Sequence, residues 1–189
     1  MKNEDGQSLV ELALTLPLLL VLLLGVAELG HIAYASINVS NAAKAAGQYA
    51  AQNTSTAVQT GSILAAAQNE VATVPGLVGS LSLDQPTSMP DGSPLPTGTV
   101  CNASGSSYSC SYCSCSSPDI DPPGTDPAKM KYPPFACGAG DALTRCVGNS
   151  HLEQNIIIET RIAVSPVVTV PGMDGPMNMY GHAVVKRLQ

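Results

Sequence analysis

The sequence has few charged and few aromatic side chains. Only 12% of its 189 residues are charged, and it contains no Trp, one Phe and three His. With 8 basic and 14 acidic residues, its net charge is −6. A chain without a broad basic face is poorly suited to neutralise phosphates, so we expect no nucleic-acid partner.

The sequence also lacks the usual catalytic and cofactor motifs. It has no nucleophile–His–Asp pattern, no phosphate-binding loop and no H-E-x-x-H motif. The segment PDIDPPGTD places Asp119, Asp121 and Asp126 close together, but its prolines break the regular spacing of a calcium loop and favour a solvated acidic turn. We therefore predict a protein that is not an enzyme and holds no cofactor or metal.

A long apolar run lies close to the N-terminus. Residues 12–27, LALTLPLLLVLLLGVA, contain no charge, and extension to Ala35 adds only Glu28 and His31 as strongly polar side chains. A bilayer core is about 30 Å thick and requires about 20 apolar residues in a helix. The run predicts a single membrane-spanning helix, in which Pro17 should introduce a kink or a local opening.

Two other interpretations of this run are a secretory signal peptide and an ordinary N-terminal anchor. Residues 33–35, Ala-Tyr-Ala, could serve as a signal-peptidase site, but the residues before the run are not positively charged. An ordinary anchor explains the apolar run but not its flanks. In particular, Glu11 stands at the edge of the run with no nearby Lys or Arg, and an unpaired carboxylate is costly there.

The residues around Glu11 resemble those of a known family. The stretch GQSLVEL, residues 6–12, resembles the cleavage region of type IV pilin-like proteins. The longer segment GQSLVELALTLPLLLVLLLGVAELGHIAYASINVSNAAKAAGQYA resembles the TadE-like family, which are minor pilin-like (pseudopilin) components of tight-adherence (Tad) pilus systems. Leu12 departs from the pattern, because many members have Phe or Tyr there.

This resemblance implies a processing step and a set of partners. A prepilin peptidase would cut between Gly6 and Gln7, leaving a new α-amino group. Such an amine has a pKa of about 7.7–8.0, so it could pair with Glu11 of a neighbouring helix and set the assembly register. The other implied partners are pilins, the Tad assembly platform and the lipid bilayer, with homo- or hetero-oligomers formed through the N-terminal helix.

The first half of the chain divides into three parts. Residues 1–6 are the expected leader, 7–52 the membrane and extended helix, and 53–85 a second helix and first strand. The extended helix should pack on its own head or on neighbours through apolar positions at helical spacing, which are Ile32, Ala35, Val39, Ala42, Ala43, Ala46 and Ala50. The second helix is predicted over Gly61–Val74 and the strand over Leu77–Leu83.

Residues 86–150 form an insert rich in Cys and Pro, without apolar periodicity. All six cysteines lie here: Cys101, Cys110, Cys113, Cys115, Cys137 and Cys146. Three disulfides in an oxidising compartment are the main prediction. Alternatives are a zinc site formed by Cys110, Cys113, Cys115 and Cys137, or a redox pair formed by Cys110 and Cys113. Six cysteines allow fifteen pairings, among which Cys137–Cys146 would close a short loop.

Residues 151–189 are predicted to form C-terminal antiparallel strands. Apolar side chains alternate with polar ones over Asn155–Val170, and a second strand follows over Asn178–Leu188, after a turn at Pro171–Pro176. We thus expect an α+β, pilin-like fold in a single-pass inner-membrane protein, with the N-terminus cytoplasmic and the head periplasmic or extracellular. The alternative function is a membrane-anchored or secreted disulfide-rich binding module outside any pilus.

Overall fold

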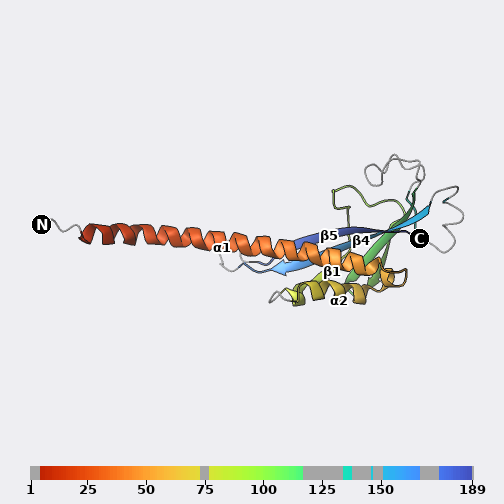
Figure 1. Ribbon diagram of the computed structural model, residues 1–189, viewed down its shortest axis with the longest axis horizontal. Coiled ribbons are helices and arrows are strands. Elements are labelled where there is room, and N and C mark those ends of the chain that lie inside the picture. Colours follow the sequence, from red (N-terminus) through yellow and green to blue (C-terminus); the bar gives the residue numbers. More distant parts are fainter. Residues whose placement is uncertain are drawn as a thin grey trace.

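The computed structural model describes residues 5–72, 77–116, 134–137, 146, 151–166 and 175–188. One long helix projects from a small head, in which its C-terminal half lies along an antiparallel sheet (Figure 1). This confirms the predicted α+β, pilin-like fold class, with an apolar N-terminal helix, a second helix, an antiparallel sheet and disulfide bonds.

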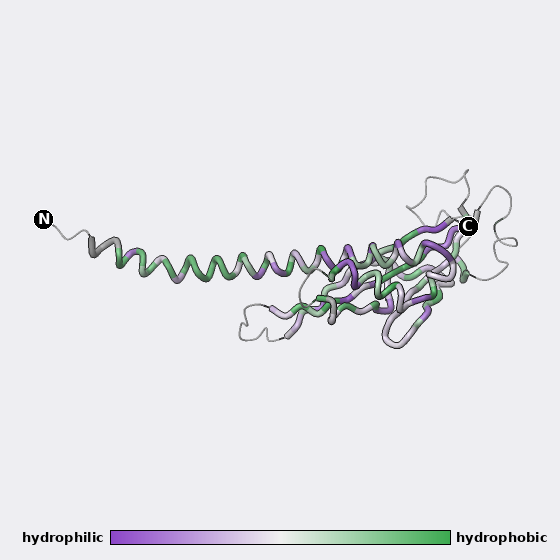
Figure 2. The backbone as a smooth tube through the Cα atoms, turned by 60° about the horizontal axis from the view of Figure 1, so that its bottom comes forward, coloured by the Kyte–Doolittle hydropathy of each residue, from purple (hydrophilic) through white to green (hydrophobic). Residues whose placement is uncertain are grey.

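Helix α1 extends over Asp5–Ala50 as one continuous element of 46 residues. It continues through Pro17, so the loss of one backbone hydrogen bond at this position does not interrupt the helix. Apolar residues dominate its first half, whereas polar and apolar residues alternate where it joins the head (Figure 2). Where the helix ends, the Thr56 hydroxyl lies 3.2 Å from the carbonyl oxygen of Ala50 and 2.8 Å from that of Asn53.

The C-terminal half of α1 buries the face predicted from its spacing. Its buried side chains are Ala35, Val39, Ala42, Ala43, Ala46 and Ala50. These side chains are small, so the helix axis lies close to the sheet. A Cβ atom added at Gly47 would lie 2.7 Å from Cγ2 of Val185, which explains why glycine occupies this position.

Helix α2, Thr60–Glu70, packs against α1. Its buried residues Ile63 and Ala67 and the following Val71 belong to the core, as the spacing predicted. The helix ends four residues earlier than Val74, which lies outside the described residues.

The sheet has five strands, and all of its pairings are antiparallel. The central strand is β4, His151–Val164. Strand β5, Met177–Leu188, pairs with one edge of β4 along nearly its whole length. Strands β3, Ser107–Ser116, and β1, Ser82–Asp84, share the other edge end to end. Strand β2, Val100–Ser104, pairs with β3.

Several boundaries differ from those predicted. The first strand is only three residues long, because Val78–Ser80 forms a 3₁₀ turn, although Leu81 and Leu83 are both buried as the pattern suggested. Strand β4 begins at His151 rather than Asn155 and ends at Val164. The predicted turn at 171–176 lies largely outside the described residues. Strands β2 and β3 both fall within residues 86–150, where we predicted no strand.

Each side of the sheet has its own cover. The side facing α1 and α2 carries the alternating apolar side chains of β4, among them Ile156, Ile158 and Ile162. On the other side, Met89 and Leu95 pack over a small cluster that contains Ile157. The sheet therefore has a large core under the helices and a smaller one under the loop that precedes β2.

All six cysteines form disulfides. The pairs are Cys101–Cys110, Cys113–Cys137 and Cys115–Cys146. The predicted Cys137–Cys146 pair is therefore wrong. Cys113 exchanges two backbone hydrogen bonds, of 2.8 and 2.9 Å, with Phe135, and this isolated bridge brings Cys137 next to Cys113. With every thiol oxidised in a disulfide, the structure gives no support to the zinc or redox alternatives.

Candidate membrane-anchoring and assembly site

The first half of α1 presents apolar side chains that the head does not cover. Every described side chain from Leu9 to Ala27 is exposed, and the most apolar 18-residue window has a mean hydropathy of 2.6. At about 1.5 Å per residue, the 21 positions 9–29 span about 31 Å, which matches a bilayer core of about 30 Å. By length and composition, this helix fits a single-pass membrane anchor.

The three residues predicted for processing and assembly lie in the first two turns of α1. The Gly6–Gln7 bond lies in its first turn, and Glu11 follows four residues after Gln7, about 6 Å further along the axis. Glu11 is exposed, and within the described part of the chain no cation forms an ion pair with it. The structure places the three close together on one helix, and their roles stay predictions.

The head begins to bury side chains of α1 near Glu28. Glu28, His31 and Ile32 are partly buried, and Ala35 is the first fully buried residue of α1. Nδ1 of His31 is enclosed, and among the described residues it has no hydrogen-bond partner. The two polar side chains noted at the end of the apolar run thus lie where the helix enters the head.

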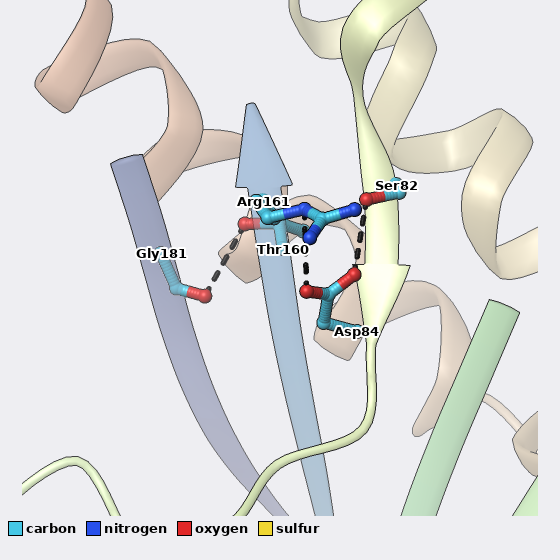
Figure 3. Close-up of polar contacts among 5 residues, drawn as sticks. All are labelled: Ser82, Asp84, Thr160, Arg161 and Gly181. Atoms are coloured by element: carbon cyan, nitrogen blue, oxygen red, sulfur yellow. Dashed lines mark hydrogen bonds and ion pairs between the residues drawn. The ribbon is translucent and has the colours of Figure 1, made fainter. Parts of the chain in front are cut away.

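The backbone of α1 comes closest to the sheet at Thr160 and Gly181. The Thr160 hydroxyl is fully buried and lies 2.9 Å from the carbonyl oxygen of Val39. It also lies 3.2 Å from the carbonyl oxygen of Gly181 (Figure 3). A Cβ at Gly181 would collide with the Val39 carbonyl and lie 2.7 Å from Oγ1 of Thr160. Glycine at this position lets α1 lie directly over the paired strands. The contact of the Thr160 hydroxyl with the Val39 carbonyl then fixes the position of α1 along the strands.

The opposite side of the sheet carries a row of charged groups across three strands. Asp84 and His182 are the register neighbours of Glu159 on either side. Nε of Arg161 lies 3.3 Å from Oδ2 of Asp84, whose Oδ1 accepts a 3.1 Å hydrogen bond from Ser82 (Figure 3). Nδ1 of His182 lies 3.5 Å from Oε2 of Glu159.

Burial raises the pKa of Glu159 above its ordinary value of 4.5. The nearby His182 lowers this pKa and the Asp84 carboxylate raises it further. Within the described residues, no group of three or more His, Cys, Asp or Glu side chains is arranged to hold a metal ion. The row consists of two neighbouring contacts, Asp84–Arg161 between β1 and β4 and Glu159–His182 between β4 and β5.

The alternation predicted over Asn155–Val170 places Glu159 and Arg161 on the same face of their strand, but it does not identify Asp84 and His182 as their neighbours. Those neighbours depend on the strand register, which the sequence does not specify. A weak signal for the contact of α1 with the sheet was present, because Thr160 interrupts the apolar row that Ile156, Ile158, Ile162 and Val164 form on β4.

An exposed apolar helix that continues into a disulfide-bonded α+β head is the arrangement of a membrane-anchored, pilin-like protein. Among protein families, the one described as TadE-like protein matches residues 6–48. The match covers nearly all of α1 and begins at Gly6. It confirms the predicted resemblance over this segment and implies an association with Tad pilus systems. The match ends at residue 48 and does not cover the rest of the head.

No curated protein matches this chain. No solved structure matches it either.

Proposed function

We propose that this protein is a minor pilin-like structural subunit of a Tad-type pilus, processed by a prepilin peptidase after Gly6 and acting in pilus initiation, anchoring or adhesion. The observation that carries the proposal is the match of the TadE-like family to α1, a helix whose first half exposes a mostly apolar surface. This function needs a helix that packs and a head that is displayed, and it requires no catalytic centre.

Assembly would occur by lateral packing of the N-terminal helices. After cleavage, the amine of Gln7 lies one helical turn before Glu11, so a neighbouring helix shifted by about one turn would bring an amine to each carboxylate. A buried carboxylate without a partner costs several kcal/mol. The pair would therefore select one register among parallel helices and add little net stability.

With its N-terminus in the cytoplasm, the subunit would cross the inner membrane once and carry its head in the periplasm or outside the cell. Its partners would be the prepilin peptidase, other pilins and the Tad assembly platform. The disulfide-bonded insert, residues 86–150, would be the part specific to this subunit and the one available for adhesion.

The processing step is tested with a Gly6→Leu variant expressed in the native host, with Asn3→Leu as the matched control in the leader. We expect the wild-type chain and the control to lose residues 1–6 and to begin at Gln7, because only position 6 adjoins the cut. The Gly6→Leu chain should keep its leader. Intact-mass spectrometry measures this directly, and a wild-type chain that still begins with Met1 would contradict the proposal.

The assembly role is tested with Glu11→Gln, which removes the charge and keeps the shape. Glu28→Gln is the control, because it removes another carboxylate of the same helix. We expect Glu11→Gln to leave the subunit in the membrane and to reduce its recovery with other pilins severalfold, while the control retains it. If assembly is unchanged, the alternative of an anchored disulfide-rich binding module is favoured.

A further inference from the structure

The geometry of α1 and β5 shows how far the head extends towards the membrane. The two elements run in the same direction, since Val39 lies at Gly181 and Gly47 lies at Val185. Eight helical residues rise about 12 Å and four strand residues about 13 Å, so the two spacings agree. Going back from Gly181 to Met177 therefore descends about 13 Å, to the level of residues 30–31 of the helix.

The burial of side chains along α1 independently supports the conclusion that the head reaches down to residues 30–31 of the helix. Side chains are exposed up to Ala27, partly covered at Glu28, His31 and Ile32, and fully covered at Ala35. In the ribbon view, the end of the β4–β5 pair lies beside the middle of α1, well before the end of the helix (Figure 1). The head thus extends along the helix to the end of the apolar segment, and no stalk separates the two.

The level of residues 30–31 of α1 coincides with the headgroup layer of a bilayer. If positions 9–29 fill the hydrocarbon core, each headgroup layer adds about 5–8 Å, because a whole bilayer is about 40–45 Å thick. That distance corresponds to about residues 30–34 of the helix. The paired strand ends, Val164 with Met177 and Ala163 with Asn178, lie within the same layer.

The residues at these strand ends suit an interfacial environment. Among the described residues Ser165, Pro166 and Gly175–Met179, none is charged, and Pro176 and Asn178 are exposed. On α1, the exposed Tyr34 lies at the outer edge of the layer, where tyrosine is enriched in membrane proteins. The nearest basic side chains lie outside this end: Arg161, two residues from Ala163 on β4, pairs with Asp84, and His182, four residues from Asn178 on β5, lies beside Glu159.

We propose that this membrane-proximal end of the head, formed by residues 163–166 and 175–179, contacts the lipid headgroups of the bilayer that holds α1. The surface is continuous with the apolar surface of α1, and it lacks basic groups, so it should bind zwitterionic phospholipid without requiring anionic lipid. Contact on this side would limit the tilt of the head relative to the membrane. The proposal depends on membrane insertion of α1 and not on assembly into a pilus.

The absence of Trp in the native chain makes a direct test possible. Single Trp residues are introduced at Asn178 and, as a second reporter, at Pro176. The control is Val58→Trp, at an exposed apolar residue beyond the C-terminal end of α1, and Leu20→Trp reports insertion of the helix. Each full-length variant is reconstituted in phosphatidylcholine vesicles without brominated lipid, with lipid brominated near the headgroup, or with lipid brominated near the chain ends to probe Leu20→Trp at the centre of the span, after mass spectrometry confirms three disulfides.

We expect the emission of Asn178→Trp and Pro176→Trp to shift to shorter wavelength in vesicles and to be quenched by the brominated lipid. Leu20→Trp should be quenched by the lipid brominated near the chain ends, whereas Val58→Trp should retain its full emission with either lipid. If Leu20→Trp is quenched and the two strand-end reporters behave like Val58→Trp, the lipid contact is disproved while the membrane anchor stands. If Leu20→Trp is not quenched, the anchor and the lipid contact are both disproved.

Discussion

Gly181 allows the closest approach of the long helix to the backbone of the sheet. Any side chain at Gly181 would push against the backbone carbonyl of Val39, which cannot rotate away as a flexible side chain could. The Thr160 hydroxyl completes this contact from the neighbouring strand. The contact depends on two residues that are 121 positions apart in the sequence, Val39 and Thr160, and no local pattern identifies it.

Gly181→Ala should destabilise the protein by about 1–3 kcal/mol, the usual range for overpacking in a tight contact. The matched control is Gly61→Ala in α2, where an added Cβ meets nothing within 4 Å. That change should leave stability equal or slightly higher, because alanine favours a helix over glycine. Urea unfolding of the full chain in detergent micelles measures both, and equal midpoints would show that the helix does not pass so close to β5.

Glu159 should make stability depend on pH. Because its pKa is raised in the folded state, the folded protein holds this proton more tightly than the unfolded chain. Its contribution to the free energy of unfolding is therefore present below pH 4.5 and is lost as the pH rises through the raised pKa. Relative to the Glu159→Gln variant, the wild-type chain should lose stability over this interval.

Asp91 provides a control of opposite sign. Hydrogen bonds from the side chain and the backbone of Ser93 lower the pKa of Asp91 below 3.8, so its contribution is present above that value and is lost as the pH falls through the lowered pKa. Asp91→Asn should therefore change the pH profile at the acid end only. Urea unfolding at a series of pH values measures both variants, and parallel profiles for wild type and Glu159→Gln would contradict the burial of this carboxyl group.

For the helices and strands, the buried faces were predicted better than the residues at which each element begins and ends. Apolar spacing identified the buried sides of α1, α2 and β4, since each side follows from the period of a regular element. The pattern failed for β3, SYSCSYCSCS, because Cys and Tyr take the places of aliphatic residues there. Its inward positions Cys113 and Cys115 are held by disulfides, so the strand needs little apolar periodicity.

The two longer disulfides should contribute most to stability. On the chain-entropy model, Cys115–Cys146, separated by 31 residues, should contribute roughly 3–4 kcal/mol. The matched comparison is Cys101–Cys110, separated by 9 residues, for which roughly 2–3 kcal/mol is expected. Replacing each pair by serine and measuring urea unfolding gives the two values. A larger loss for the shorter loop would show that packing around the sulfur atoms, and not loop closure, dominates.

At the scale of the whole molecule, the sequence predicted the fold class but not the order of the strands. The insert contributes β3, which occupies part of the edge of β4 that β1 also uses. This arrangement depends on contacts between segments that are 40 or more residues apart, such as the 3.1 Å hydrogen bond from Asn155 to Ser114. Periodicity within a segment carries no information about such pairings.

The first half of α1 is exposed and its second half is buried by the head. We therefore predict that the head folds without the first half of α1. Residues 9–27 of α1 are exposed throughout, so they contribute nothing to the core. A chain that begins at Glu28 should form the same three disulfides and remain in solution without detergent, whereas one that begins at Ala43 should lose the buried Ala35 and Val39 and fail to fold. Mass spectrometry and circular dichroism of both chains test this, and an unfolded Glu28 chain would refute it.

The common direction of α1 and β5 also determines how the molecule carries mechanical load. The described chain ends on β5 at the far end of the head, opposite to the N-terminus (Figure 1). A pull between these two ends would slide β5 lengthwise along β4, so that the pairs from Val164 and Met177 to Glu153 and Leu188 resist together. In this shear arrangement the bonds cannot break one after another, which suits a subunit held in lipid at one end and pulled at the other.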